Sequence, residues 1–363
     1  MKKIVIRFLL PMLSVLLLSA CQQEQAANQT QAEQQTFRWK MVTSWPKNFP
    51  GLGTSAEHFA QVVNEMSAGR LQIKVYGAGE LVPALEVFDA VSQGTAEMGH
   101  SSPYYWKGKA VAAQFFTTVP FGMTALEMNS WMQYGGGQEL LTELYAPFNL
   151  VVFPAGNSGI QMAGWFNKEI NSVADLKGLK MRIPGLGGEV LARAGGTPVM
   201  LPGGEVFTAL QTGAIDATEW VGPYNDLAFG LHKAAKYYYY PGWHEPGSLI
   251  ELMINKPAFE RLPADLQAIV RVAAQAVNDK MLAEMTARSM QALNDMQQKH
   301  GVQLRPLPDD VLQHLKGISA EVLNDIAASD PMAQKVYDSM STYTDQIRAY
   351  HAVTEQAYMN ARD

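Results

Sequence analysis

Cysteine is nearly absent from this sequence of 363 residues, and basic residues are few. The chain has 1 cysteine, 28 Lys and Arg residues and 34 Asp and Glu residues, so its formal net charge is −6. A single cysteine excludes a disulfide scaffold and any cysteine-rich zinc or iron–sulfur site. The lack of a basic excess argues against a nucleic-acid-binding protein, because neutralising phosphates requires many cations.

Charged residues as a whole are also scarce, at 17% of the chain, against ~25% in typical soluble domains. Hydrophobic residues make up 47% of the chain. A sequence this apolar can bury a large core, which excludes a largely disordered protein. Its length is sufficient for two or three domains.

The sequence motifs of several enzyme classes are missing. There is no P-loop, and the nearest matches to other motifs fail. Residues 156–159 (GNSG) are not a GxSxG nucleophile elbow, and Pro246 directly after His244 and Glu245 prevents an HExxH helix. Residues 185–188 (GLGG) lack the full spacing of a dinucleotide-binding loop. This argues against a hydrolase or a dehydrogenase, although the members of a catalytic triad need not be close in sequence.

The N-terminus has the pattern of a secretory signal. Lys2, Lys3 and Arg7 flank an apolar run over residues 8–18, which is shorter than the ~20 residues of a membrane span. The run leads into residues 18–21 (LSAC), which resemble the bacterial lipobox. The pattern predicts export from the cytoplasm.

Cys21 is therefore predicted to be the lipidated first residue of the mature chain, with residues 1–20 removed as a lipoprotein signal peptide. The alternative is an ordinary signal cleavage near Ala20, which would leave Cys21 as a free thiol. Residues 22–36 contain no large apolar side chain, so we expect residues 21–36 to form a disordered tether. No later run in the sequence resembles a membrane helix.

From Phe37 onward, strand-like and helix-like segments alternate. Helices are expected after capping boxes at Thr54–Glu57 and Thr124–Glu127, after Pro83, and over residues 205–212. Regular alternation predicts an α/β fold with mostly parallel strands. The expected strands are residues 37–43, 71–76, 96–100, 149–154, 161–166, 179–183 and 214–220.

The amino-acid composition changes after Pro263. Residues 264–299 contain no Pro or Gly and predict one long helix, and residues 309–328 and 332–361 predict further helices. Such a tail is either a packing arm or interface, or a plain helical cap on the same domain. The pattern alone favours neither.

Charged residues at strand ends are the candidate functional groups. Arg182 lies in an apolar strand before a glycine turn, so it needs either a ligand carboxylate or an internal ion-pair partner. Glu219 and Trp220 end another expected strand, where the carboxylate would bind a cation or cap a helix. Asn157 and Gln161 flank a strand start, and such amides often satisfy loop backbone instead.

Aromatic residues are the other notable feature. The run Tyr237–Tyr240 is interpreted as a buried strand. Six further aromatic residues are candidates for the wall of an apolar pocket, although each is equally suited to an ordinary core. These are Trp45, Tyr104, Tyr105, Trp106, Trp220 and Trp243.

Ordered segments from about Phe37 to the C-terminus carry a family resemblance. They are residues 41–46 (MVTSWP), 79–83 (GELVP), 94–100 (GTAEMGH), 103–109 (PYYWKGK), 164–166 (GWF), 175–182 (DLKGLKMR), 215–217 (IDA), 219–224 (EWVGPY) and 240–247 (YPGWHEPG). Together they resemble the periplasmic solute-binding subunit of TRAP transporters, in the branch that binds 2-oxo monocarboxylates such as pyruvate.

The resemblance implies two α/β lobes around a ligand cleft, with a long lobe-spanning helix and a helical C-terminal extension. Lobe 1 would comprise residues 37–155 plus about 248–290, and lobe 2 residues 156–247. Residues 291–363 would be C-terminal helices that can exchange between the protomers of a homodimer. Ligand binding would close the lobes in a hinge motion.

The resemblance also implies a site in which a sodium or calcium ion bridges ligand and protein. Arg182 would grip the ligand carboxylate. The residues placed against the ligand are Arg182, Asn157, Tyr104, Tyr105, Gln161 and Trp220. The cation ligands would be the side chains of Gln161 and Glu219 and the backbone carbonyl of Trp220, with Glu245 as a fourth candidate.

We therefore expect a binding protein rather than an enzyme. It would capture a small 2-oxo acid and deliver it to a TRAP membrane permease. The alternatives are lactate, another hydroxy acid or a longer 2-oxo acid as ligand, or a chemosensory binding protein that docks to a receptor. A lyase or decarboxylase is disfavoured because no general base stands at a usable spacing. Many members of the family are free in the periplasm, so the lipid anchor predicted at Cys21 is a departure.

Overall fold

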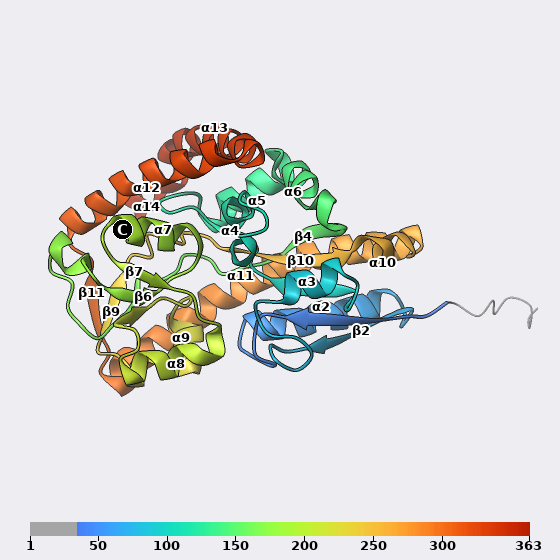
Figure 1. Cartoon of the computed structure of the whole chain (residues 1–363), viewed down its shortest axis with the longest axis horizontal. Helices are drawn as coiled ribbons and strands as arrows, with labels where there is room; N and C mark the ends of the chain where they lie inside the picture. The colour runs from blue at the N-terminus through green and yellow to red at the C-terminus, as the bar shows by residue number, and fades with distance from the viewer. Residues whose placement is uncertain (1–34) are drawn as a thin grey trace, which may run out of the picture.

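The computed structural model describes residues 35–363, which form two lobes, each built around one β-sheet (Figure 1). The first sheet has the strand order β2-β1-β3-β10-β4. Its strands are β1 (Phe37–Thr43), β2 (Leu71–Tyr76), β3 (Met98–Ser101), β4 (Leu150–Asn157) and β10 (Leu249–Asn255). The signal-peptide, lipidation and tether predictions for residues 1–34 lie outside the described residues.

The second sheet has the order β11-β9-β5-β8-β6-β7. Its strands are β5 (Gly164–Phe166), β6 (Lys180–Arg182), β7 (Thr197–Val199), β8 (Ala217–Thr218), β9 (Tyr237–Tyr240) and β11 (Gln303–Pro306). Nearly all expected strands exist, but that over residues 214–220 is reduced to Ala217–Thr218.

Strand pairing in the described residues is mixed: five of the nine pairings are parallel and four are antiparallel, so the expected parallel majority is narrow. β1 pairs in parallel with β2 and β3, whereas β10 is antiparallel to both β3 and β4. The reason lies in the connectivity. The chain leaves the first sheet along β4 and re-enters it along β10, so these two neighbours run in opposite directions. In the second sheet β5 is likewise antiparallel to β8 and β9.

Short helices cover both sheets. Those of the first lobe are α2 (Leu52–Met66), α3 (Val87–Ser92), α4 (Ala113–Thr117), α5 (Ala125–Tyr134), α6 (Gly137–Tyr145) and α10 (Lys256–Glu260). Those of the second lobe are α7 (Gly185–Arg193), α8 (Gly203–Thr212) and α9 (Pro223–Phe229). Single 3-10 turns are η1 (Pro103–Trp106), η2 (Ala146–Phe148), η3 (Val173–Leu176) and η4 (Leu231–Lys233).

The long helix α11 (Ala264–His300) joins the lobes, as expected from the sequence. Its N-terminal half buries Val270 and Val277 in the core of the first lobe. Farther along, Met285 and Met296 pack in a cluster with residues of the second lobe. A single rigid helix thus contributes to both cores (Figure 1).

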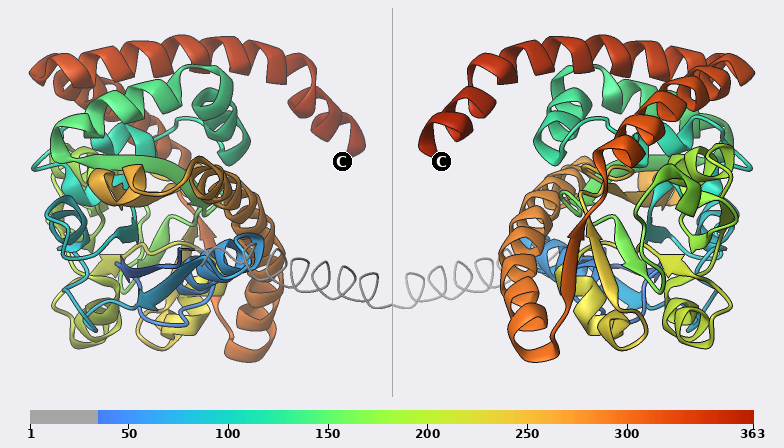
Figure 2. Two further views of the ribbon diagram at one scale, coloured as in Figure 1. Left: turned by 90° about the vertical axis from the view of Figure 1, so that its right-hand side faces the viewer. Right: turned by 90° about the vertical axis from the view of Figure 1, so that its left-hand side faces the viewer.

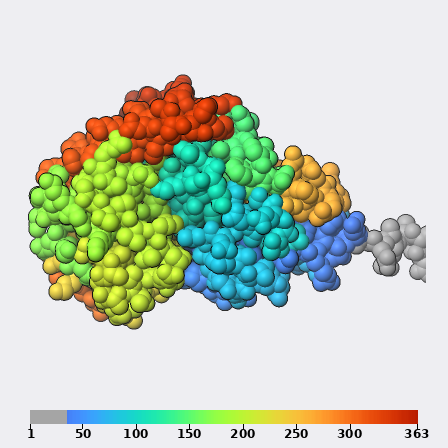
Figure 3. Space-filling model, viewed as in Figure 1, coloured from blue at the N-terminus to red at the C-terminus, as the bar shows by residue number. Residues whose placement is uncertain are grey.

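The C-terminal helices lie across both lobes. They are α12 (Asp309–Ser329), α13 (Pro331–Val353) and α14 (Glu355–Arg362). α12 packs on α7 of the second lobe and α13 on α4, α5 and α6 of the first (Figure 3). The single helix expected over residues 332–361 is broken at Thr354, whose φ of −120° and ψ of −96° are not helical. α14 buries no residue and projects beyond the body (Figure 2).

Two local predictions about helix starts were wrong and one was confirmed. The Thr124–Glu127 capping box forms at the start of α5. α2, however, begins at Leu52 after Gly51 (φ 70°), and Glu57 instead accepts a hydrogen bond from the Asn48 backbone. The helix expected after Pro83 starts only at Val87, because residues 83–86 close a turn. No helix within residues 35–363 has the length and apolarity of a membrane span.

Candidate functional site

The candidate site lies between the lobes, where strands of both sheets end. Arg182 is the last residue of β6, and the backbone N–H of Glu219, just after β8, donates to the Arg182 carbonyl at 3.1 Å. This backbone bond fixes the two oppositely charged residues side by side. Ligands of open α/β sheets commonly bind at the carboxyl ends of strands.

The guanidinium of Arg182 is 1% exposed and is held on three sides. Its Nε donates to the Leu201 carbonyl at 3.2 Å, its Nη1 pairs with Glu219 Oε1, and its plane lies 4.9 Å from the centroid of the Trp220 ring. Nη2 has no hydrogen-bond partner within residues 35–363. Both roles considered for Arg182 from the sequence therefore have support. It forms an internal ion pair, and it keeps one donor for a ligand carboxylate.

The carboxylate of Glu219 is fully buried, and its Oε2 has no hydrogen-bond partner in the described chain. Burial raises the pKa of this carboxyl to about 7, against the opposing effect of Arg182. The Nε2 of His244 lies 3.8 Å from Oε2. A bound cation would supply the positively charged partner that this oxygen lacks.

A second carboxylate, Glu245, is held by a polar network. Gln161 Nε2 donates to Glu245 Oε2 at 2.8 Å, and the hydroxyl of Ser248 donates to the same oxygen. Burial and the charge of Glu219 raise the pKa of Glu245 to about 7. Gln161 Oε1 is buried without a partner among residues 35–363.

Asn157 comes from the first sheet, and the two tyrosines come from a 3-10 turn of the first lobe. Asn157 ends β4; its Oδ1 accepts from the Gly159 N–H at 2.9 Å, whereas its buried Nδ2 has no partner in the described residues. Tyr104 and Tyr105 lie on η1, with ring centroids 4.7 Å apart. The Tyr104 backbone N–H donates to Thr117 Oγ1 at 2.8 Å, which anchors this turn to α4.

A small cavity of about 10 Å³ lies beside these groups. That is about the space of one water molecule, so the lobes must move apart to admit even a small ligand. Its lining draws on both lobes and comprises Trp45, Leu52, Ser102, Tyr104, Tyr105, Ser158, Gln161, Trp220, Val221, Ser248 and Ile250.

Four of the six candidate wall aromatics line this cavity, and two do not. Trp106 turns into the core of the first lobe, where its Nε1 donates to Glu251 at 2.5 Å. Trp243 packs against Phe121 at 5.8 Å between centroids. Tyr105, the neighbour of Trp106 in sequence, does line the cavity. Tyr237–Tyr240 do form a strand, although Tyr240 is 41% exposed.

The unpartnered buried atoms of the site fall into two chemical kinds. Arg182 Nη2, Asn157 Nδ2 and Trp220 Nε1 are donors, whereas Gln161 Oε1 and Glu219 Oε2 are acceptors. A buried polar atom without a partner costs about 1–3 kcal/mol. Donors suit an anion and oxygen acceptors suit a hard cation, so the residues present fit an anionic ligand together with such a cation.

Sequence reasoning missed three polar residues here. His244 was considered only for the HExxH pattern, yet it is 1% exposed and faces Glu219. Ser158 and Ser248 line the cavity and hydrogen-bond with Gln161. The available signal was position: His244 is adjacent to the candidate Glu245, and Ser158 to Asn157.

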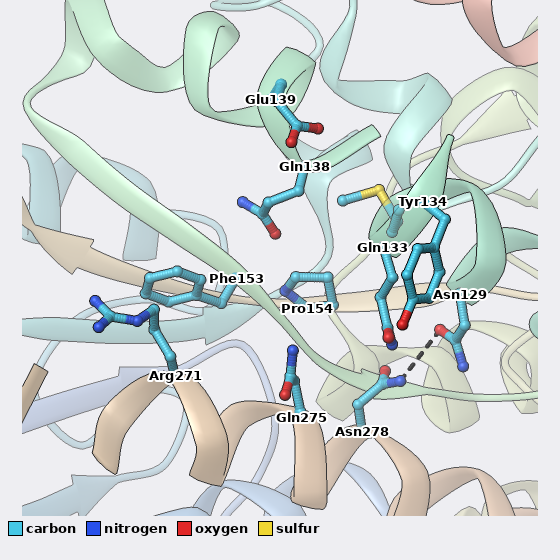
Figure 4. Close-up of a pocket in the computed structure, with 11 residues that line it drawn as sticks. Asn129, Gln133, Tyr134, Gln138, Glu139, Phe153, Pro154, Arg271, Gln275 and Asn278 are labelled. Carbon is cyan, nitrogen blue, oxygen red and sulfur yellow. Dashed lines mark hydrogen bonds between the residues drawn. The ribbon is translucent and has the colours of Figure 1, made fainter. Parts of the chain in front are cut away.

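A larger cavity, of about 330 Å³, lies between α5, α6, β4 and α11 (Figure 4). Its charged residues, Arg271 and Glu139, are exposed, and amide and apolar side chains line the rest. Asn278 and Asn129 hydrogen-bond to each other at 3.1 Å. Because this cavity holds no buried charge, size alone does not make it the site of an anionic ligand.

Two lobes that enclose a small cavity beside buried charged side chains define a solute-binding protein. Residues 41–330 match the family described as bacterial extracellular solute-binding protein, family 7 (DctP), and the chain belongs to this family. Its members are the solute-binding subunits of TRAP transporters, not enzymes, so this chain is a binding subunit as well.

Close relatives carry informative names. The chain is 46% identical over 343 residues to the monocarboxylate 2-oxoacid-binding periplasmic protein of a Nostoc species, covering 94% of this chain and 93% of that protein. It is similar to a TRAP periplasmic solute-binding protein of Pseudoalteromonas atlantica with bound sodium and pyruvate: TM-score 0.87, 45% identity, 90% of this chain and 99% of that one. It is also similar to a TRAP periplasmic solute-binding protein of Colwellia psychrerythraea with bound calcium and pyruvate. That match has a TM-score of 0.88 and 46% identity and covers 90% of this chain and 100% of that one.

Proposed function

We propose that this protein captures a small, pyruvate-like 2-oxo monocarboxylate together with a sodium or calcium ion and delivers it to a TRAP membrane permease. The observation that carries the proposal is the pair of unpartnered atoms on Arg182 and Glu219, a donor beside an acceptor in one buried site. The names of the relatives, with pyruvate and either cation, support the ligand class.

Arg182 Nη2 and Asn157 Nδ2 would donate to the ligand carboxylate, and Tyr104 and Tyr105 would close over its small apolar end. Pyruvate has about six non-hydrogen atoms, so its binding free energy cannot exceed roughly −9 kcal/mol. One methyl group contributes only about 1 kcal/mol of that. Charge and hydrogen bonds must therefore supply most of the affinity.

The cation would be held by Gln161 Oε1, Glu219 Oε2 and the backbone carbonyl of Trp220, with Glu245 as a fourth candidate. All are oxygen donors, as Na⁺ and Ca²⁺ prefer. When bound, the cation would polarise and orient the carboxylate and 2-oxo oxygens of the ligand. A 2-oxo acid offers two such oxygens as a chelate, which a plain monocarboxylate does not.

The lobes would be residues 37–155 plus about 248–290, and residues 156–247, with residues 291–363 as the C-terminal helices. The proposed boundaries lie near the end of β4 and just before β10, the strands along which the chain leaves and re-enters the first sheet. Lys107 of the first lobe and Glu189 of the second form an ion pair across the divide. Opening of the lobes would break this exposed pair and release the ligand to the permease.

Cys21 would carry the lipid that anchors the protein to a membrane of the cell envelope, with residues 21–36 as the tether. The sequence pattern of the lipobox supports this assignment. The anchor would keep the binding protein close to the permease without touching the cavity.

The C-terminal arm would exchange between two protomers in a homodimer. Tyr350, Val353, Tyr358 and Met359 are 60%, 75%, 65% and 47% exposed along α13 and α14. Apolar side chains on a helix that projects from the body favour a protein partner (Figure 2).

A thermal-shift screen tests the ligand class. Pyruvate, longer 2-oxo acids, lactate and propionate would each be added with sodium, with calcium or with neither. A specific ligand raises the melting temperature by mass action. We expect the largest shifts from 2-oxo acids with a cation present. Larger shifts from lactate or propionate would overturn the proposed ligand class.

A further inference from the structure

His244 is a buried polar side chain beside the cavity, and the proposed function gives it no role. It is 1% exposed, and neither Nδ1 nor Nε2 has a hydrogen-bond partner among residues 35–363. An imidazole nitrogen that carries no proton is a common metal ligand.

Two carboxylates complete a cluster around this ring. One ligand atom from each of Glu219, His244 and Glu245 lies within 4.8 Å of the others, and all three residues are buried. The Nε2 of His244 is 3.8 Å from Glu219 Oε2. Ligands of one ion stand about 3–3.5 Å apart at bond lengths of about 2.0–2.2 Å. Side-chain shifts on the order of 1 Å would therefore close the cluster around an ion.

We propose that Glu219, His244 and Glu245 form a second donor set in this cavity, which binds a first-row divalent transition metal through the imidazole nitrogen. It rests on the proposed function in sharing Glu219, and the fourth candidate Glu245, with the sodium or calcium set. Imidazole nitrogen suits cobalt, zinc and similar ions, whereas the set of Gln161 and the Trp220 carbonyl is all oxygen. Because both sets use Glu219, one ion excludes the other.

The local charges favour a divalent ion. Arg182 contributes one positive charge, and Glu219 and Glu245 contribute two negative charges when ionised. A divalent metal makes this group of residues net positive by one, and a monocarboxylate anion then makes it neutral. A transition metal would accordingly compete with sodium or calcium while still leaving a positive site for the anion.

The probe is Co²⁺, followed by its visible absorption. The protein would be freed of metal with chelator and carry Cys21→Ser, which removes the thiol as a competing ligand. We expect saturable binding of one Co²⁺ in the cavity. His244→Gln should weaken it at least tenfold, the lower end of the ~10–100-fold that lost partners of metal ligands typically cost. The Ca²⁺ affinity of His244→Gln should differ from that of the wild type by no more than about twofold, because calcium takes oxygen ligands.

His232→Gln is the matched control. The rings of His232 and His300 lie 4.4 Å apart and form another imidazole pair outside the cavity. The His232→Gln substitution should leave the main Co²⁺ absorption signal unchanged. Equal Co²⁺ binding by wild type and His244→Gln, or a signal that only His232→Gln removes, would overturn the second donor set.

A measurement on the wild-type side chain covers the case in which His244→Gln does not fold. In protein with ¹⁵N-labelled histidine, Co²⁺ should displace or broaden the His244 imidazole signals before those of His232. Unaffected His244 signals would contradict the proposal. Pyruvate binding with Ca²⁺, measured on the same preparation, separates the two hypotheses, since it tests the proposed function without any transition metal.

Discussion

Arg182 and Glu219 form an ion pair that is closed to solvent, and each keeps one polar atom unused. Their side chains are 1% and 0% exposed, yet Arg182 Nη2 and Glu219 Oε2 have no partner among residues 35–363. A pair built only for stability would satisfy these atoms, since an isolated buried charge is costly. The leftover donor and acceptor are the basis of the proposed capture of an anion and a cation together.

Arg182→Ala should remove 2-oxo acid binding, at a cost of about 2–5 kcal/mol in binding free energy. It should also lower the melting temperature, because Glu219 loses its partner. Arg182→Lys should bind poorly too, since an ammonium group cannot replace the planar fork. Calorimetric titration measures both effects.

Arg193→Ala is the control for Arg182. This arginine pairs with Asp325 at the surface, with side chains 42% and 64% exposed, and such pairs contribute little. The ligand affinity of Arg193→Ala should match that of the wild-type protein. If Arg182→Ala also bound like wild type, Arg182 would have no role in ligand recognition.

Glu219→Gln should weaken cation binding and ligand binding together, because binding of one is linked to binding of the other. Arg182→Ala should instead cost more ligand affinity than cation affinity, since the cation oxygens stay in place. Glu169→Gln, an exposed acid that pairs with Arg305, should change neither. Calcium and pyruvate titrations on the three variants give the comparison, and an unchanged calcium affinity in Glu219→Gln would return this residue to a structural role.

The buried carboxyl group of Glu251, which lies away from the cavity, should make the stability of the fold depend on pH. It is fully buried, accepts from Trp106, and its pKa is raised by burial to about 8. Between pH 4.5 and 8 the folded protein keeps this proton while the unfolded chain loses it. Stability therefore falls as pH rises through this window, by up to about 1.4 kcal/mol per pH unit.

Glu251→Gln should flatten that slope and stabilise the protein most at and above pH 8. Melting temperatures of both proteins from pH 5 to 9 test this, in buffers without ligand. The difference between the two curves should grow with pH. A difference that stays constant would mean that Glu251 does not change its charge on unfolding in this range.

The sequence predicted those features that depend on local pattern. The strands at Phe37–Thr43 and Leu71–Tyr76 were placed almost to the residue because apolar and polar residues alternate in them. The long helix α11 was placed as closely because its sequence contains no Pro or Gly. Arg182 was recognisable as a candidate because a charge in an apolar strand requires a partner. Its partner, Glu219, follows another strand, β8, and could be identified only from the fold.

Features set by tertiary contacts were not predictable. His244 reaches Glu219 only because the segment between β9 and β10 crosses between the lobes. The strand expected to include Glu219 and Trp220 stops at Thr218, since these two residues leave the sheet to form the cavity. Trp106 and Trp243 were misplaced because the sequence does not show which way an aromatic side chain points.

Cys21→Ser should move the protein from the membrane fraction to the soluble envelope fraction, with ligand affinity unchanged. The residue precedes the described fold, so its loss removes only the lipid. Cell fractionation with immunodetection is the measurement. Wild-type protein found already in the soluble fraction would contradict the lipoprotein assignment.

Deletion of α14, residues 355–363, should shift a dimer to monomer in analytical ultracentrifugation. No residue of α14 is buried, so the melting temperature of the monomer should barely change. Ligand affinity should also be retained, because the arm lies away from the cavity. A full-length chain that sediments as a monomer at all concentrations would argue against exchange of the arm.

The most direct test of cation-assisted capture is a pyruvate titration by calorimetry in exhaustively chelated, sodium-free buffer. The same titration is then repeated after adding sodium or calcium. We expect weak or no binding without a cation and strong binding with one, and Glu219→Gln should lose this difference. Full pyruvate affinity with no cation present would contradict the central claim.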